Sequence, residues 1–310
     1  MKKIFTALLV AALAASALAG CSSNNDSSTS DNSSTSSTVS TASDAGSTDE
    51  EKITGTVNVI SREEGSGTRD AFVELTGVLV KGDDGTKTDN TVSSAVILSN
   101  TQSVMSNVSG DKQAIGYISL GSVNDSVKAV KIGGVEATVD TVKDGSYELQ
   151  RPFNIVTKED LSNEVANDFI SYILSADGQA IVEDNGYVSV SDAEAYSGSQ
   201  PSGEITVAGS SSVSPVMEKL KEAYEAINPN ATIKIQTFDS STGITSAIEG
   251  SCEIGMASRA LKDTETGVVS TEIALDGIAV IVNNENSTDD LTIDQIKQIF
   301  TGEVTEWDNI

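Results

Sequence analysis

The sequence contains no histidine, two cysteines and four prolines in 310 residues, and aromatic residues make up 4% of it. Without an imidazole, neither a Ser-His-Asp nor a Cys-His nucleophile system can form, and an HExxH zinc site is excluded as well. A net charge of −27 argues against nucleic acid as a partner, because duplex DNA is bound by clustered Lys and Arg. An anion bound by this protein must therefore be held by local hydrogen-bond donors, against an overall negative field.

The N-terminus has the pattern of a secretory signal. Lys2 and Lys3 precede an apolar run, Ile4 to Leu18, which is shorter than a typical membrane span. The run ends in Leu-Ala-Gly-Cys21, which resembles the lipobox of bacterial lipoproteins, whose cysteine carries lipid such as palmitate and becomes the first mature residue. An ordinary signal peptide with an incidental cysteine is the alternative. We predict a signal peptide over 1–20 and a lipid anchor at Cys21, on the extracytoplasmic face of the cell membrane.

Two segments offer almost nothing that a core could bury. Residues 22–51 contain 17 Ser or Thr in 30 positions, so ordering them would cost entropy without a compensating gain. We predict a disordered tether over 21–52. Residues 191–203 are rich in Ser, Asp, Ala and Gly and indicate a linker, whose bounds between the two parts of the fold we place at 196–203. With Cys21 lipidated, Cys252 would have no disulfide partner in the chain, and we expect it to be a small buried residue.

From Ile53 onward, strand patterns alternate with helix patterns. Strands are predicted at 56–60, 114–118, 147–157, 204–208, 232–237, 253–256 and 277–282. Helices are predicted at 69–75, 99–108, 159–174, 176–185, 215–227, 244–249 and 292–300. Residues 127–142 alternate in part and predict a hairpin that turns at Gly133-Gly134. The alternation indicates an α/β fold with mostly parallel sheets and flanking helices.

Three segments share one order of elements, a strand, a turn rich in Gly and Ser, and then a helix: 60–69, 209–213 and 239–243. The first turn of a helix leaves N–H groups without intrahelical partners, and its dipole makes that end positive, so such turns suit an anion. Arg62 adds a planar, permanently charged donor fork. The alternative is that these Ser, Thr and Asp residues only cap their own helices. None of the three has the form GxxxxGK[ST] or GxGxxG of a nucleotide site.

Residues 61–69, Ser-Arg-Glu-Glu-Gly-Ser-Gly-Thr-Arg, resemble the signature of the periplasmic and lipoprotein phosphate-binding proteins of ABC importers, the PstS family. Further similar segments are 113–119, 147–157, 175–190, 209–215, 255–259, 276–280 and 299–307. In that family the Gly-Ser-Ser-Ser segment comes first, whereas here it follows the 61–69 segment. The chain therefore looks like a circular permutant whose old ends are joined by 191–203; a truncated piece of a tandem array is the alternative.

The resemblance implies a two-lobed periplasmic-binding-protein-like fold of type II, with two hinge crossovers. One lobe would comprise 53–152 and 285–310 and carry the Arg-x-x-Gly-Ser-Gly-Thr loop. The other would comprise 153–195 and 204–282 and carry the Gly-Ser-Ser-Ser loop. Trp307 would pack inside its lobe near the hinge rather than contact a ligand.

The family's phosphate contacts fall on two groups of residues in this chain. They are Arg62, Ser66, Gly67 and Thr68 in one lobe, and Ser211, Ser212, Ser240 and Ser258 in the other. Arg62 would pair with the anion, and the others would donate hydroxyl or amide hydrogens. Some members have an aspartate where this chain has Ser258; serine offers no charge repulsion, which makes discrimination against sulfate less secure. For Arg259 we leave open whether it adds charge to the site or faces solvent.

These features predict a solute-binding protein, not an enzyme, that captures inorganic phosphate in the cleft between the lobes and delivers it to the permease of an ABC importer. No cofactor and no metal are expected; Asp83-Asp84-Gly85 with Asp89 lacks the spacing of a calcium loop and predicts a β-turn. The alternatives are a general, sulfate-like oxyanion binder and a phosphate-sensing or adhesion protein that reuses the fold. A phosphatase is a further alternative, which no paired-carboxylate motif or metal-ligand cluster supports.

Overall fold

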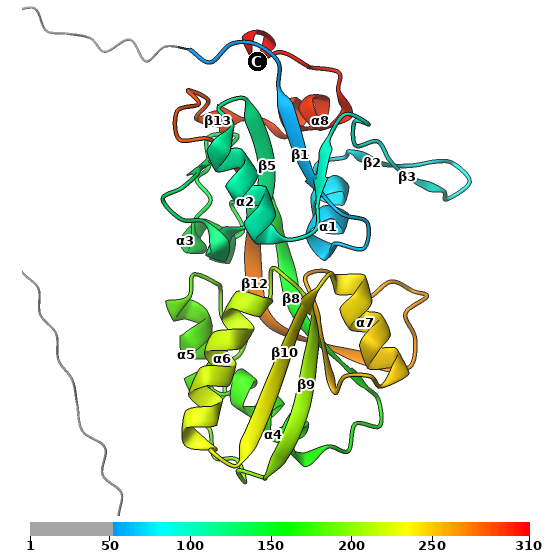
Figure 1. Ribbon diagram of the computed structural model, residues 1–310, viewed down its shortest axis with the longest axis vertical. Coiled ribbons are helices and arrows are strands. Elements are labelled where there is room, and N and C mark those ends of the chain that lie inside the picture. Colours follow the sequence, from blue (N-terminus) through cyan, green and yellow to red (C-terminus); the bar gives the residue numbers. More distant parts are fainter. Residues whose placement is uncertain (1–51) are drawn as a thin grey trace, which may run out of the picture. The chain divides into compact units, whose positions relative to one another are not determined.

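A nine-stranded sheet runs through residues 52–310, the part of the chain that this computed structural model describes (Figure 1). The main path has the order β10 (Ala231–Phe238), β9 (Gly203–Ser210), β11 (Ile254–Ala257), β8 (Gln150–Lys158), β12 (Val268–Val282), β5 (Ala114–Ser119), β1 (Asn58–Arg62) and β4 (Val96–Leu98). A short strand, β6 (Lys128–Ala129), pairs with β12 beside this path. The predicted signal peptide, Cys21 and the tether up to residue 51 lie outside the described residues.

Two strands, β8 and β12, divide this sheet into two halves. We call residues 52–149 and 277–310 half A, and residues 150–276 half B. Helices α1 (Gly67–Leu75), α2 (Thr101–Gly110), α3 (Val139–Lys143) and α8 (Ile293–Thr301) belong to half A, and α4 (Glu164–Leu174), α5 (Ala176–Asp184), α6 (Ser214–Ile227) and α7 (Ser240–Glu249) belong to half B. In Figure 1, β8 and β12 cross from one half to the other between these two groups of helices.

Strand direction changes along the sheet. At the half-B end, β9 pairs in parallel with β10 and β11, and at the half-A end β1 pairs in parallel with β4 and β5. In the middle, β8 pairs antiparallel with β11 and β12, and β12 pairs antiparallel with β5. The sheet is therefore mixed: the expected parallel βα units lie at both ends, and an antiparallel ribbon joins them. In each parallel part the carboxyl ends of the strands lie at one edge, which is where ligands bind in such folds.

Each half has its own hydrophobic core. In half A, Phe72 stacks on Tyr117 with ring centroids 3.9 Å apart, and Phe300 packs edge-on against Phe72 at 4.7 Å. In half B, Phe169 packs against Tyr224 at 5.1 Å. Each such side chain stabilises its half by roughly 1.5–3 kcal/mol through burial. The two halves thus have separate cores, which are connected by the ribbon and by Val188 of half B, which packs in the core of half A.

Strand β12 contributes to both cores. Ile273 packs in half B, whereas Ile278 and Val280, a few residues on, pack in half A. A division into two lobes, which stays a prediction, would therefore place its boundary near Gly277 rather than at residue 282. Residues 191–202, in the predicted linker, contain no regular secondary structure.

Several sequence-based expectations need correction. Residues 127–142 do not form a hairpin of two strands: β7 (Lys131–Ile132) pairs with β13 (Asp290–Leu291), and the end of the segment is helix α3. The capping box of Thr138 and Thr141 explains that helix. The turn at Gly133-Gly134 does form, between mutual hydrogen bonds of Ile132 and Val135.

Sequence analysis also missed four short strands, β13 and three others. The strands β2 (Leu79–Lys81) and β3 (Lys87–Asp89) form a hairpin that projects from half A in Figure 1, and β4 precedes α2. Asp83, Asp84 and Gly85 lie in the turn of that hairpin, as predicted. Among residues 52–310, no group of acidic or sulfur side chains is arranged to hold a metal ion.

The sequence also led to expectations for two single residues, Cys252 and Trp307. Cys252 is buried and free, as expected, and burial raises the pKa of its thiol to about 11. Trp307 is buried in the core of half A, but it lies near the chain end, where its Nε1 donates to the Gln113 carbonyl at 3.0 Å. In Figure 1 this chain end lies at the far end of half A from β8 and β12, so the prediction that Trp307 lies near the hinge is wrong. No helix in residues 52–310 is both long enough and apolar enough to cross a membrane.

Candidate functional site

In half A, the candidate site begins where β1 passes into α1. Arg62 is the last residue of β1, and Ser66 caps α1 by accepting a hydrogen bond from the Arg69 amide at 3.3 Å. The Tyr117 hydroxyl, within 2.7 Å of Ser61 Oγ, accepts from the Arg62 amide at 3.2 Å. The parallel pairing of β1 with β4 and β5 places this turn at the carboxyl edge of the sheet.

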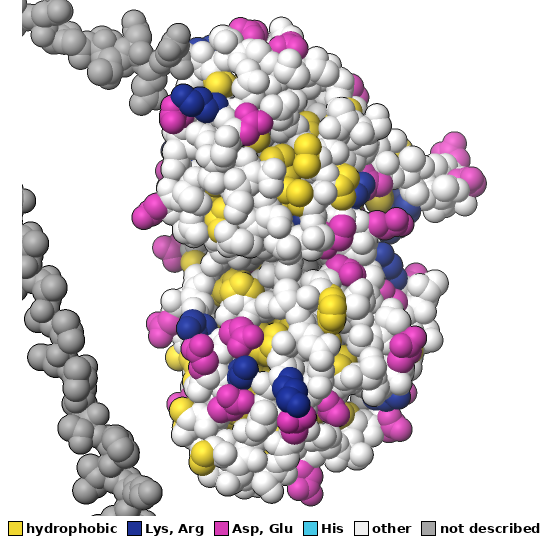
Figure 2. Space-filling view, in the orientation of Figure 1, with side chains coloured by type: hydrophobic (Ala, Val, Ile, Leu, Met, Phe, Trp, Pro, Cys, Tyr) yellow, Lys and Arg dark blue, Asp and Glu magenta, His cyan; other side chains and the backbone are white. Residues whose placement is uncertain are grey.

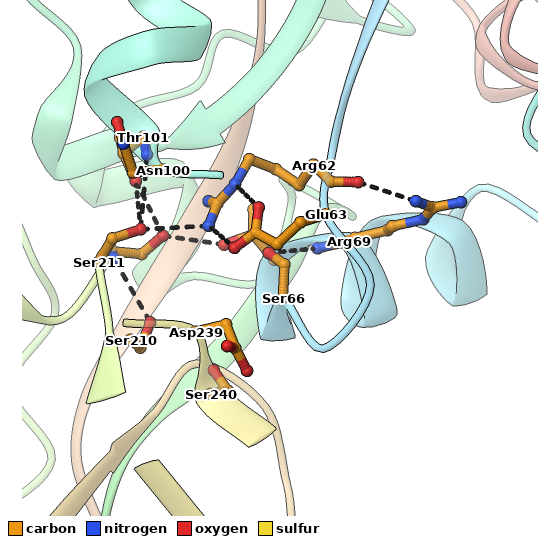
Figure 3. A network of polar contacts seen from close by, with 12 residues as sticks. Arg62, Glu63, Ser66, Arg69, Asn100, Thr101, Ser210, Ser211, Asp239 and Ser240 are labelled. Atoms are coloured by element: carbon orange, nitrogen blue, oxygen red, sulfur yellow. Dashed lines mark hydrogen bonds and ion pairs between the residues drawn. The ribbon is translucent and has the colours of Figure 1, made fainter. Parts of the chain in front are cut away.

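The Arg62 side chain is buried, with 2% of its surface exposed, yet it is not fully paired. Its Nε and Nη2 both donate to the Glu63 carboxylate at 2.7 Å, and Nη2 also donates to Ser211 Oγ at 3.1 Å (Figure 3). Its Nη1 has no hydrogen-bond partner among residues 52–310. Because an unsatisfied buried charged donor is costly, this atom marks a place where an acceptor belongs.

In half B, the ends of two parallel strands and the start of a helix bring hydroxyl groups together. Ser210 ends β9, Ser240 begins α7, and Ser258 follows β11. Ser210 Oγ lies 3.1 Å and Ser240 Oγ 3.2 Å from Ser258 Oγ, and the Ser258 amide donates to Ser240 Oγ at 3.0 Å. Gly209 makes this packing possible, because a Cβ there would lie 2.4 Å from the Met256 carbonyl oxygen.

Contacts across the two halves bring the predicted residues to one place. Thr68 Oγ1 lies 2.8 Å from Ser212 Oγ, and the Ser241 amide donates to the Gly65 carbonyl at 3.2 Å. Gly67 approaches half B so closely that a Cβ would lie 2.4 Å from Ser240 Oγ and 2.8 Å from Ser258 Oγ. Arg62, Gly67 and Thr68 therefore face Ser211, Ser212, Ser240 and Ser258, and Ser66 caps the helix start beside them. Their role as ligand contacts stays a prediction.

Sequence analysis missed two residues at this site. Glu63 holds the Arg62 guanidinium in place, and Thr101 Oγ1 lies 3.4 Å from Ser211 Oγ and 3.3 Å from Ser212 Oγ. Thr101 begins α2, directly after β4 and the capping Asn100, so it follows the same strand, turn and helix order as the other loops. The capping Asn100 and the helix after it are visible in the sequence. Strand β4 has only three residues, which is too short for a strand pattern, so the turn before Thr101 was not recognised.

Two of the residues at the candidate site cap their own helices, as the alternative interpretation of the sequence expected. Ser66 caps α1, and Asp239 caps α7 by accepting from the Thr242 amide at 2.9 Å. Both caps begin the helices whose first residues, Gly67 and Ser240, meet between the halves. The first turns of α1 and α7 thus lie next to each other between the halves, with the Arg69 and Thr242 amides bonded to the caps and the Ser241 amide bonded to the Gly65 carbonyl.

Charged side chains of both signs surround the site. In Figure 2, acidic side chains are spread over both halves of the visible face, with Lys and Arg between them. Behind the site, on the connecting ribbon, lies a buried ion pair of Arg151 with Asp276, with Nη2 to Oδ2 at 3.1 Å. Burial raises the pKa of Asp276 to about 6, although Arg151 and Ser119 oppose this.

Arg259 neither faces solvent nor reaches the serine cluster. Its Nη1 and Nη2 donate to the Glu265 carboxylate at 2.8 and 2.7 Å, and Nη2 also donates to Ser241 Oγ at 3.1 Å. Burial would raise the pKa of Glu265, but the hydrogen bonds from Arg259 and from the Lys262 amide hold it below its usual value. Arg259 also pairs with Asp70 of half A, at 3.0 Å.

Comparisons with known proteins agree with the geometry. The model of a PBP superfamily domain matches residues 28–177 and 194–309. The chain is 55% identical over 258 residues to a Streptococcus agalactiae protein called phosphate-binding protein PstS 2, covering 83% of this chain and 88% of that one. It is also similar to a crystal structure of a phosphate-binding protein of a phosphate ABC transporter from Streptococcus pneumoniae, with 50% identity and a TM-score of 0.66, over 83% of this chain and 100% of that one.

Some relatives align with this chain over a shorter stretch. The phosphate-binding protein PstS of Bacillus subtilis is 32% identical over 110 residues, which is 34% of this chain and 37% of that protein. The S. agalactiae protein, by contrast, aligns over most of its length. The permuted order of segments stays a prediction. The chain belongs to the PBP superfamily, among the PstS-like phosphate-binding proteins.

Proposed function

We propose that this protein binds inorganic phosphate between halves A and B and delivers it to an ABC importer. The observation that carries the proposal is Arg62 Nη1, a buried cationic donor without a partner among residues 52–310, beside hydroxyl groups from both halves. A tetrahedral oxyanion would accept from this atom, from Thr68 and from the serine hydroxyls. The relatives' names, which specify phosphate, support the same ligand.

The mechanism we infer is binding without chemical conversion. The halves would separate about β8 and β12, phosphate would enter, and closure would surround it with donors from both sides. A desolvated anion needs a hydrogen-bond partner for every oxygen, which the turns around Arg62, Thr68, Ser211 and Ser240 would supply. The similar proteins are transport-binding proteins, which supports a receptor rather than an enzyme.

The partner and the location follow from the same proposal. A receptor of this kind would present its closed, loaded form to the membrane permease of the importer. Cys21, outside the described residues, would carry lipid and hold the protein on the extracytoplasmic face of the cell membrane. Mass spectrometry of the protein purified from membranes tests this part: a lipid mass on an N-terminal Cys21 is expected, and an unmodified or absent Cys21 would contradict it.

Isothermal titration calorimetry tests the ligand. Protein beginning at Ser22 is titrated with phosphate and, separately, with sulfate. Saturable binding of phosphate is expected, and Arg62→Ala should abolish it while leaving the thermal unfolding midpoint within a few degrees, because Arg62 contributes a charge to the site rather than packing to a core. Absence of any heat or stabilisation with either anion would overturn the proposal.

One observation favours a broader oxyanion binder as the second candidate. The serine cluster around Ser258 contains only hydroxyl groups, which can donate to sulfate as well as to phosphate. The same titration distinguishes the two candidates. Equal affinity for both anions would establish the general oxyanion binder, whereas a preference for phosphate of at least about tenfold, or 1.4 kcal/mol, would exclude it.

A further inference from the structure

An ion-pair cluster joins the two halves beside the candidate site. Asp70 lies in the first turn of α1, two residues after Thr68, and Arg259 and Lys262 follow β11 in half B. Asp70 Oδ2 lies 3.0 Å from Arg259 Nε and 2.8 Å from Lys262 Nζ. None of these three residues belongs to the set predicted to touch the anion, so the cluster needs an explanation of its own.

In half B, the Arg259 side chain is held by hydrogen bonds to residues of half B alone. The Arg259 side chain is 6% exposed, and its hydrogen bonds go to Glu265, to Ser241 and to the Ala260 carbonyl, all of half B. Its guanidinium is therefore held in position whether or not Asp70 is near. Asp70 is the group that would arrive when α1 approaches half B and depart when it moves away.

The attraction between Asp70 and its two partners is Coulombic rather than directional. The distances are those of ion pairs, but neither contact has the geometry of a hydrogen bond, so this buried oxygen has none within residues 52–310. An attraction of this kind tolerates small movements and weakens as salt screens it. One carboxylate facing two cations, beside the seam between the halves, favours the closed arrangement.

We propose that Asp70, Arg259 and Lys262 form an electrostatic latch that holds the halves closed and sets how long a bound anion stays. The proposal rests on the proposed function, because it concerns release from the same site. The latch acts on Thr68 and Gly67 through α1, so these three are positioning residues and not ligand contacts. Since the open form lacks the Asp70 pairs, the latch slows release and leaves the rate of capture unchanged.

The main test compares Asp70→Asn with Glu74→Gln, which removes the same charge from the same helix. Within the described residues, Glu74 pairs with exposed Lys81 and Lys87 of half A, so it serves as the matched control. Stopped-flow measurement should show phosphate release about 3- to 10-fold faster in Asp70→Asn, with association unchanged, and no change in Glu74→Gln. Asp70→Glu, which keeps the charge, should restore slow release.

The dependence of the release rate on salt concentration tests the electrostatic role of the cluster, because a purely structural role would leave this dependence unchanged. Release from the unsubstituted protein should accelerate as ionic strength rises, whereas release from Asp70→Asn should depend on salt much less. Lys262→Gln, which leaves α1 intact, should give a smaller acceleration of about twofold, and it keeps the test valid if Asp70→Asn fails to fold. Equal release rates and equal salt dependence in all variants would overturn the latch.

A distance measurement separates failure of the latch from failure of the proposed ligand. Spin labels are attached at Ser106→Cys on α2 and Ala226→Cys on α6, two exposed positions in different halves. In the ligand-free protein, Asp70→Asn should increase the population of long distances, and Glu74→Gln should not. If phosphate fails to bind the unsubstituted protein, the proposed function falls, and this measurement alone then decides for or against the latch.

Discussion

Two buried arginines, Arg151 on strand β8 and Arg62 at the end of β1, differ in how completely they are paired. Arg151 lies on the connecting ribbon and uses its donors on Asp276 and on the Ser258 carbonyl, with its guanidinium 5.2 Å from the Phe153 ring centroid. Arg62 lies between the halves and keeps Nη1 without a partner among residues 52–310. Both arginines have a carboxylate partner, but each nitrogen atom of the Arg151 guanidinium has an acceptor, whereas one nitrogen atom of Arg62 has none among the described residues.

The partners of the two arginines explain the difference. Asp276 stands directly across from Arg151 in the pairing of β12 with β8, so the register of the ribbon brings the charges together. Glu63 is the sequence neighbour of Arg62 and fixes two of its nitrogen atoms on one side. This arrangement orients the Arg62 guanidinium while it leaves Nη1 available on the other side.

The largest expected effect comes from removing the ribbon arginine. Arg151→Met leaves the Asp276 carboxylate buried without its cation, which typically costs about 3–5 kcal/mol. Arg62→Met should lower the unfolding free energy of the phosphate-free protein by about 1 kcal/mol or less, because Glu63 is partly exposed to solvent. Urea unfolding measures both, and equal losses in the two variants would remove the distinction between the arginines.

The next effect concerns the approach of α1 to half B. In Gly67→Ala the new methyl group would meet Ser240 Oγ and Ser258 Oγ, so closure should be hindered and phosphate affinity should fall by about 10- to 100-fold. Gly110→Ala in α2 is the control, because nothing lies within 4 Å of its Cβ position. Calorimetry should find full affinity in the control; full affinity in Gly67→Ala would mean that the halves do not meet there when the ligand is bound.

A smaller effect concerns pH and the ribbon carboxyl. The pKa of Asp276 is raised from 3.8 to about 6, so the folded protein holds the proton more tightly than the unfolded chain does. The contribution of Asp276 to stability is therefore fully present below about pH 4 and is lost as pH rises to 6 and above. The difference in unfolding free energy between the unsubstituted protein and Asp276→Asn should fall across this range, whereas carboxyls with lowered pKa values, such as Glu265, cancel in the difference. A difference that rises with pH would contradict the assignment.

The smallest effect is expected for a solvated pair. Lys219 Nζ lies 2.8 Å from Glu222 on α6, and both side chains are more than half exposed. Lys219→Gln should change the unfolding free energy by less than about 0.5 kcal/mol and leave phosphate affinity unchanged, because such pairs are screened by water and salt. A loss comparable to that of Arg151→Met would show that burial does not separate the two kinds of pair.

Much of the site could be predicted because its loops are locally encoded. Ser66 and Asp239 are good helix caps, and glycines follow or precede them where backbones approach closely, so the turns at 60–69 and 239–243 are visible in the sequence. The resemblance of 61–69 and 209–215 to one family then implied that these turns share a ligand. The structure brings these turns together, which is a statement about their positions and not about the ligand.

Other features escaped sequence analysis because they depend on partners far along the chain. Thr101 enters the site through a strand of three residues, and β12 begins nine residues before the predicted 277–282, where its pairing with β8 sustains an irregular, partly polar stretch. The expected hairpin at 127–142 failed because the partner of β7 is β13, which lies more than 150 residues away. Pairing over such separations leaves no local pattern to read.

By itself, the sequence determined the absence of imidazole chemistry, the alternation of strands and helices, the helix caps and the family to which the chain belongs, since each depends on residue type and short-range spacing. Only the tertiary structure decided which donor atoms of the buried arginines have a hydrogen-bond acceptor and which have none. Residue type does not distinguish Arg62, Arg151 and Arg259. Sheet register pairs Arg151 with Asp276, and the meeting of the two halves adds Asp70 to Arg259. Arg62 pairs with its sequence neighbour Glu63 and keeps Nη1 without a partner among residues 52–310. Charge pairing acts through space over a few ångströms, and only the folded chain sets those distances.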